Sequence, residues 1–100
     1  MNFIFEISDK TDREIHLTKE RWTHITSPTS LHPYMVNYLE EVKQNLIKLD
    51  LIVPQKFDDS MMNYYKYIKE EEMYLLVGVK YLSSKGFVTT AFLTRKMLRK

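Results

Sequence analysis

The feature that most constrains this chain is a pair of long β-prone segments near its C-terminal end. Residues 73–82 read MYLLVGVKYL and residues 87–96 read FVTTAFLTRK, with only SSKG between them. Both segments are rich in β-branched and aromatic residues, which favour strands. A four-residue connection that contains glycine favours an antiparallel hairpin. Such a hairpin needs other elements to cover its apolar face, so the rest of the chain has to supply them.

Alternation assigns the two faces of this hairpin. The odd positions of residues 73–82 form an apolar row that we expect to face helices, and Lys80 belongs to the opposite, open face. One strand register adds Thr89 to that open face, whereas a connection one residue longer or shorter brings Thr90 and Thr94 onto it. The sequence leaves both registers open.

The helices that cover the sheet are expected earlier in the chain. An apolar stripe at steps of four, three, four and three residues predicts an amphipathic helix that begins near Pro33. Its members are Met35, Leu39, Val42, Leu46 and Leu49. A shorter helix is expected at about 19–26, after an N-cap at Thr18 and before Pro28.

The remaining segments complete an α+β fold. Residues 3–7 alternate as a strand does, and residues 14–17 look like its partner in a short hairpin. Residues 51–54 are a short apolar run, and residues 63–69 have high β propensity. We therefore predict a short N-terminal β-hairpin and two helices packed on a C-terminal antiparallel sheet, all in one domain of residues 1–100.

Composition excludes several classes of protein. The chain has no cysteine, which excludes disulfides, thiol chemistry and cysteine-based zinc sites. Its three histidines fall on three different expected elements and form no HxxxH pattern, so we expect no metal site and no cofactor. We see no charged leader followed by an apolar run and no apolar stretch of membrane-spanning length, so we expect a soluble, cytoplasmic protein without membrane contact.

Charge is distributed unevenly. Residues 1–59 carry seven Lys and Arg against ten Asp and Glu, whereas residues 60–100 carry eight against three. A basic second half favours contact with phosphates, and a basic tail that serves only solubility explains the same asymmetry.

The chemically richest stretch is RWTHITSPTSLHP, residues 21–33. Trp22 and Ile25 mark the buried side of the first expected helix, and His24 is turned away from them. An exposed histidine there is either a solvated residue near the helix C-terminus or a general acid or base. His32 is expected in the connection to the second helix, where it orients the junction.

A second candidate feature is aromatic and basic. Residues 64–67 read YYKY, and cations beside aromatic rings suit a nucleic-acid backbone and its stacked bases. Tyrosines that belong to the core and surface of a strand explain the same residues.

The order of these motifs resembles a known superfamily. RWTHI is followed by HP at the start of a helix containing YLEEVKQNL, then by LDLIVP, YYKYIK, YLLVGVKYL and FVTTAFLTRK. This series, from about Ile15 to Lys96, is similar to the small phage- and toxin-associated nucleases of the barnase–EndoU–colicin–RelE (BECR) superfamily. The W-x-H-I and H-P junction and the V-T-T-A-F strand carry most of the similarity. The resemblance implies two N-terminal helices against a four-stranded antiparallel sheet.

The resemblance also implies a function, metal-independent cleavage of RNA through attack by a ribose 2′-OH. Matched to this sequence, it assigns His24 as general acid or base, Lys80 and Arg95 as phosphate clamps, and Thr90 or Thr94 as donors to a phosphoryl oxygen. Substrate-binding residues would be Lys66, Tyr67 and His32. The partners implied are RNA and an antitoxin or immunity protein.

One departure from this assignment favours a second function. No acidic residue on the later strands offers a carboxylate base, because Glu70, Glu71 and Glu72 fall in an expected turn. The alternative is a non-catalytic RNA- or protein-binding module that retains the same fold.

Overall fold

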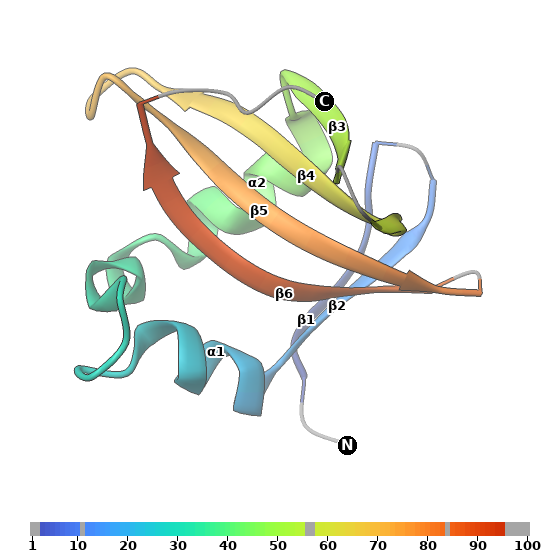
Figure 1. Ribbon diagram of the computed structural model, residues 1–100, viewed down its shortest axis with the longest axis horizontal. Helices are drawn as coiled ribbons and strands as arrows, with labels where there is room; N and C mark the ends of the chain where they lie inside the picture. The colour runs from blue at the N-terminus through green and yellow to red at the C-terminus, as the bar shows by residue number, and fades with distance from the viewer. Residues whose placement is uncertain (1–2, 11, 56–57, 84, 96–100) are drawn as a thin grey trace.

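The computed structural model describes residues 3–10, 12–55, 58–83 and 85–95, and the structural statements below refer to them (Figure 1). In chain order the elements are β1 (Phe3–Ser8), β2 (Glu14–Thr18), α1 (Lys19–Thr26), the 3₁₀ helix η1 (Pro33–Asn37), α2 (Leu39–Lys48), β3 (Leu51–Gln55), β4 (Asp58–Ile68), β5 (Met73–Leu82) and β6 (Lys85–Thr94). No helix in these ranges is long and apolar enough to cross a membrane.

The six strands form one curved, mixed sheet in the order β1-β2-β6-β5-β4-β3 (Figure 1). Neighbouring strands are antiparallel except for β2 and β6, which are parallel. The α+β class is therefore confirmed, but the predicted layout is wrong in two respects. The N-terminal hairpin joins the main sheet through β2, and the short apolar run predicted at 51–54 forms β3 at the opposite edge.

A glycine makes the parallel junction between β2 and β6 possible. Ile15 pairs with Gly86, and both residues are buried. A Cβ atom at position 86 would lie 2.6 Å from Cδ1 of Ile15 and 2.8 Å from Cγ1 of Val79, closer than side chains approach one another. Because Gly86 lacks that atom, the hairpin can pack directly against β6.

The main core lies between the helices and one face of the sheet. Val42 and Leu46 of α2 belong to the same buried cluster as Leu75 and Val77 of β5, which confirms the predicted apolar row. Ile25 and Trp22 of α1 pack against that cluster. Thr18 caps α1 as expected, because its side chain accepts a hydrogen bond from the backbone N–H of Arg21.

The second predicted helix is interrupted. η1 begins at Pro33, and α2 follows after Tyr38, whose φ of −120° and ψ of 20° are not helical. The predicted apolar stripe nevertheless faces the core, since Met35, Val42 and Leu46 are fully buried. Asn45, between them in α2, is also fully buried and donates from Nδ2 to the backbone carbonyls of Tyr64 and Leu75 at 2.9 and 3.0 Å.

The face of the sheet that we expected to be open is partly filled. A second cluster there contains the buried residues Val53, Tyr65 and Leu76, with Tyr74 and Phe92 packed against it. All of these residues come from strands. This part of the sheet is therefore a small core of its own, and the polar residues of the face lie outside it.

The turn of the β5–β6 hairpin is shorter than expected, and beyond a bulge its register is one of the two that the sequence left open. β5 ends at Leu82 and β6 begins at Lys85, so the connection is two residues shorter than SSKG. Val79 pairs with Val88, but the next residue, Gly78, pairs with Thr90. Thr89 is thus the extra residue of a β-bulge, and its hydroxyl donates to the carbonyl of Gly78 at 3.2 Å. The bulge brings Thr90 onto the face of Gly78 while keeping Thr89 beside it.

Candidate functional site

A hollow lies where α1, the connection from 27 to 32 and the outer side of β6 meet. We call it the α1–β6 hollow, and it encloses about 490 Å³ of empty space, part of which is open to solvent. Its lining residues are Arg21, His24, Ile25, Ser30, Leu31, His32, Thr89, Thr90 and Ala91. Three residues singled out in the sequence, His24, His32 and Thr90, are therefore brought to one place.

The hollow exists because β6 changes neighbours along its length. β2 pairs with β6 only as far as Phe87, so beyond this residue α1 and the connection lie beside that edge of β6. The connection is held by side-chain hydrogen bonds. The Ser30 hydroxyl donates to the carbonyl of Ile25 at 2.9 Å and accepts from the backbone N–H of His32 at 3.2 Å. These bonds turn the chain back and place His32 beside β6.

His32 is fixed by two aromatic neighbours. Its ring stacks on Phe92 of β6 with a centroid separation of 4.8 Å, and Nδ1 lies 3.1 Å from the hydroxyl of Tyr34. The same hydroxyl accepts a hydrogen bond from the backbone N–H of Leu93 at 3.1 Å. The hydrogen bond between this hydroxyl and Nδ1 can run in either direction, depending on the tautomer of His32. In the tautomer with the proton on Nδ1, the imidazole donates to Tyr34 and Nε2 keeps its lone pair.

His24 is held much less tightly. Its side chain is 67% exposed, and Nε2 lies 3.9 Å from Oε1 of Glu20, one helical turn earlier. This exposed position agrees with the prediction that His24 turns away from the apolar side of α1. Surface ion pairs of this kind contribute little to stability, so the imidazole can reorient toward a ligand in the hollow.

The other predicted site residues lie outside the α1–β6 hollow. Lys80 pairs with Phe87, and Thr94 pairs with Tyr74 near the far end of β6. Arg95 follows Thr94 and is exposed.

Lys66 and Tyr67 line a different hollow, formed by β4, the turn after it and residues 37–41. Lys66 pairs with Leu75, which faces the helices, and its Nζ donates to the carbonyl of Lys48 at 2.9 Å. This cation therefore sits at the C-terminus of α2, where the helix dipole favours it.

Two polar residues of the hollow, Arg21 and Ser30, were not selected from the sequence, whereas Thr89 was placed on the open face in one of the two registers. Arg21 could have been found, because it precedes His24 by three residues and therefore shares its side of α1. Ser30 depends on the fold of the connection, which no local pattern shows, and the choice between Thr89 and Thr90 depends on the β-bulge.

A separate polar network is buried near the start of the chain. The carboxylate of Asp9 accepts hydrogen bonds from the hydroxyls of Tyr64 and Tyr81 and, at 2.9 Å, from the backbone N–H of Arg13. The Arg13 guanidinium lies over the Tyr81 ring, 4.5 Å from its centroid. Burial raises the pKa of Tyr64 far above its usual range, and the hydrogen bond to Asp9 raises it further. This network ties the end of β1 to β4 and β5 and is structural.

Comparison with known proteins adds no identification. No family model, curated protein or solved structure matches this chain.

Proposed function

We propose that this protein is a metal-independent endoribonuclease whose active site is the α1–β6 hollow. The observation that carries the proposal is that His24 and His32 line one hollow together with Arg21. Cleavage of RNA by its own 2′-OH needs a base, an acid and a positive charge near the phosphorus. Two imidazoles and a guanidinium supply all three.

The reaction is an internal transfer of the phosphoryl group. One imidazole takes the proton of the 2′-OH as its oxygen forms a bond to phosphorus. The bond from phosphorus to the 5′-oxygen then breaks, and the second imidazole, in its protonated form, gives that oxygen a proton. The products are a 2′,3′-cyclic phosphate and a 5′-hydroxyl. No step requires a metal ion.

His32 is the better placed of the two for the role of base. With Nδ1–H donating to the Tyr34 hydroxyl, the ring is oriented as by the third member of a catalytic triad, and Nε2 keeps the lone pair that takes the 2′-OH proton. We assign His24, which is exposed on α1, as the acid for the leaving oxygen. Arg21, with Thr90, stabilises the charge that builds on the phosphoryl oxygens.

The residues outside the hollow are given a role in binding the rest of the RNA. Lys80 and Arg95 are cations on β5 and just after β6, and they would contact phosphates that flank the cleaved one. Thr94, next to Arg95 at the end of β6, would add a hydrogen-bond donor. Tyr67, which is 45% exposed, would stack on a base.

The BECR resemblance supports the same function and is itself part of the proposal. That fold places two N-terminal helices against a four-stranded antiparallel sheet. Here α1 and α2 precede β3, β4, β5 and β6, which form an antiparallel meander in that order. The hairpin of β1 and β2 is an addition at the β6 edge.

The test is incubation of purified protein with total cellular RNA in EDTA. The wild type should produce fragments with 2′,3′-cyclic phosphate ends, and His24→Gln and His32→Gln should each reduce the rate by about 10²–10⁴-fold. Glu40→Gln, on α2 and outside the hollow, is the matched control and should keep full activity. A wild type without cleavage, or histidine variants as active as the control, would refute the nuclease.

One observation favours a second candidate, a protein-binding module. Leu31 lines the hollow and is 90% exposed, and Val36 in η1 is 57% exposed. Apolar side chains beside a functional hollow suit a protein partner that covers it, such as an antitoxin or immunity protein. The second candidate predicts a protein that fails to cleave RNA and yet binds a partner protein, with Leu31→Asp abolishing that binding. This result would support the binding module and refute the nuclease.

A further inference from the structure

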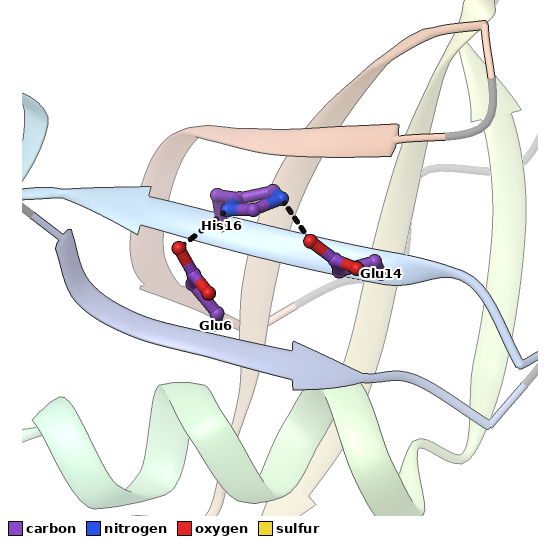
Figure 2. Close-up of side chains that lie close together, drawn as sticks. All are labelled: Glu6, Glu14 and His16. Carbon is purple, nitrogen blue, oxygen red and sulfur yellow. Dashed lines mark ion pairs between the residues drawn. The ribbon is translucent and has the colours of Figure 1, made fainter. Parts of the chain in front are cut away.

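Three titratable side chains gather on β1 and β2, away from the residues of the α1–β6 hollow. Figure 2 shows Glu6 of β1 with Glu14 and His16 of β2, and we call them the Glu–His cluster. Glu14 and His16 are two residues apart and therefore share a face of β2. Glu6 is the cross-strand partner of His16, so it shares that face as well.

His16 is buried in an apolar setting. It is 3% exposed, and its ring lies between Phe3, at a centroid distance of 4.7 Å, and Phe87, at 5.2 Å. Neither ring nitrogen makes an aligned hydrogen bond in the described part of the chain. Burying such nitrogens without a partner is costly, and a proton or a metal ion on a ring nitrogen, beside the two carboxylates, would remove that cost.

The two carboxylates are already close to the ring. Oε1 of Glu14 lies 2.8 Å from Nε2, and Oε1 of Glu6 lies 3.6 Å from Nδ1. The contact with Glu14 is short but not directed along the N–H axis. A carboxylate that shares a metal ion with an imidazole lies off that axis, because the ion occupies it.

We propose that the Glu–His cluster binds a divalent transition-metal ion, with Zn²⁺ as the best fit. One imidazole nitrogen and two carboxylate oxygens are a donor set that suits Zn²⁺ and its neighbours better than Mg²⁺ or Ca²⁺. Two carboxylates and a neutral imidazole carry a charge of −2, which a divalent ion balances. Three protein ligands leave a fourth position for water or an anion.

The geometry allows this with small side-chain movements. One ligand atom from each residue can be chosen so that all three lie within 4.8 Å of one another. Ligands of tetrahedral Zn²⁺ lie about 3.3 Å apart, given bonds of about 2.0–2.1 Å. The Glu6 and Glu14 side chains are 49% and 48% exposed, so they can rotate toward one ring nitrogen, and the ion can reach them from solvent.

The proposal is independent of the nuclease, whose reaction uses no metal. The ion would bind β1 to β2 beside the point where β2 meets β6. Binding of the ion should therefore strengthen the attachment of the N-terminal hairpin to the sheet. The proposal can be tested without RNA.

The test is titration of tag-free, EDTA-treated protein with ZnCl₂, followed by calorimetry and by thermal unfolding. One ion should bind per chain and raise the melting temperature. Glu14→Gln and Glu6→Gln should each weaken Zn²⁺ binding at least tenfold. Both side chains are half exposed, so these substitutions should leave the fold intact. The double variant Glu20→Gln with His24→Gln removes the Glu and His side chains that face each other on α1 and should bind Zn²⁺ as the wild type does.

Spectroscopy separates a metal ion from a proton at His16. Zn²⁺ should shift the ¹⁵N resonance of one His16 ring nitrogen alone, and Co²⁺ should give the visible bands of a tetrahedral site. The proposal is overturned if Zn²⁺ does not bind saturably, if the Glu14 and Glu6 variants bind it like the wild type, or if the His16 resonances respond to pH but not to Zn²⁺.

Discussion

The hydroxyl of Tyr34 lies 3.1 Å from Nδ1 of His32. It joins η1 to the imidazole that we propose as the catalytic base, and it is itself held by the backbone of β6. A base oriented in this way presents its second nitrogen in one protonation state, which is what proton transfer requires.

Replacement of Tyr34 by Phe should therefore reduce RNA cleavage about tenfold, the equivalent of one hydrogen bond of about 1.4 kcal/mol. The loss should appear in kcat more than in KM, because Tyr34 orients the base and does not hold the substrate. Single-turnover kinetics on a short RNA measure this split. Tyr74→Phe, on β5 and outside the hollow, is the matched control. An unchanged kcat in the Tyr34 variant would remove Tyr34 from the mechanism.

The dependence of the rate on pH should identify the two histidines as a pair. Since one must be neutral and the other protonated, the wild-type kcat/KM should follow a bell-shaped curve. His32→Gln should lose the limb at low pH, where the base becomes protonated. His24→Gln should lose the limb at high pH, where the acid loses its proton. A profile that keeps both limbs in both variants would contradict these roles.

The buried network around Asp9 predicts a specific alkaline instability. Burial and the hydrogen bond to Asp9 raise the pKa of Tyr64 above the value of about 10 that it has in the unfolded chain. The stabilisation from this raised pKa is complete below pH 10 and is lost as the pH rises above it, because the unfolded chain ionises first. Urea unfolding at several pH values should show stability falling above pH 10.

Tyr64→Phe should lower that alkaline slope and, at neutral pH, cost about 1–3 kcal/mol, since buried Asp9 loses one donor. Tyr67→Phe, at an exposed position on the same strand, should change neither quantity. If Tyr64→Phe keeps the full alkaline slope, ionisation of Tyr64 is not its source.

Gly86→Ala should destabilise the protein by about 1–3 kcal/mol through overpacking. The added Cβ would lie 2.6 Å from Cδ1 of Ile15, at the junction of β2 and β6. Hydrogen exchange should show the largest loss of protection in β1 and β2, because β6 keeps its pairing with β5. A second substitution, Ile15→Val, should recover part of the loss by removing that methyl group. No recovery would indicate that the contacts with Val79 and Tyr81, not the one with Ile15, select glycine here.

Asn45→Asp should cost more stability than any conservative change on the surface of α2. Nδ2 of Asn45 donates to the carbonyls of Tyr64 and Leu75, and a carboxylate would face both oxygens without a proton. Leaving a buried charge unpaired costs about 3–5 kcal/mol. Urea unfolding at pH 7 measures this loss, with Gln44→Glu as the control on the same helix. Equal stability of the two variants would show that position 45 is open to water.

Elements that depend on local pattern were predictable from the sequence. Alternation identified β5 and β6, and the apolar stripe from Met35 to Leu46 identified the side of η1 and α2 that meets the sheet. The Thr18 cap was also predictable, because it depends on residues three apart.

Features that depend on distant pairing were not predictable. The contact of Ile15 with Gly86 joins residues at opposite ends of the chain, so nothing near either residue shows it. The bulge at Thr89 changes which threonine shares a face with Gly78, and two registers fit the sequence equally well.

The candidate site also has parts that local sequence predicts and parts that depend on distant pairing. His24 and His32 stand out by residue type, but the hollow they share exists only because Ser30 turns the connection back along β6. The Glu–His cluster was missed because Glu6 reaches His16 across two strands, and histidine spacing alone carries no sign of that.

The parallel junction of β2 with Lys85–Phe87 also sets the order in which the chain can assemble. The first hairpin has no sheet to join until residues 85–87 have been synthesised, and contacts between such distant residues form late in folding. The α1–β6 hollow has the same requirement, since it needs Thr89, Thr90 and Ala91 beside α1. A nascent chain therefore carries His24 and His32 long before it reaches Ala91, and the α1–β6 hollow can form only after that point.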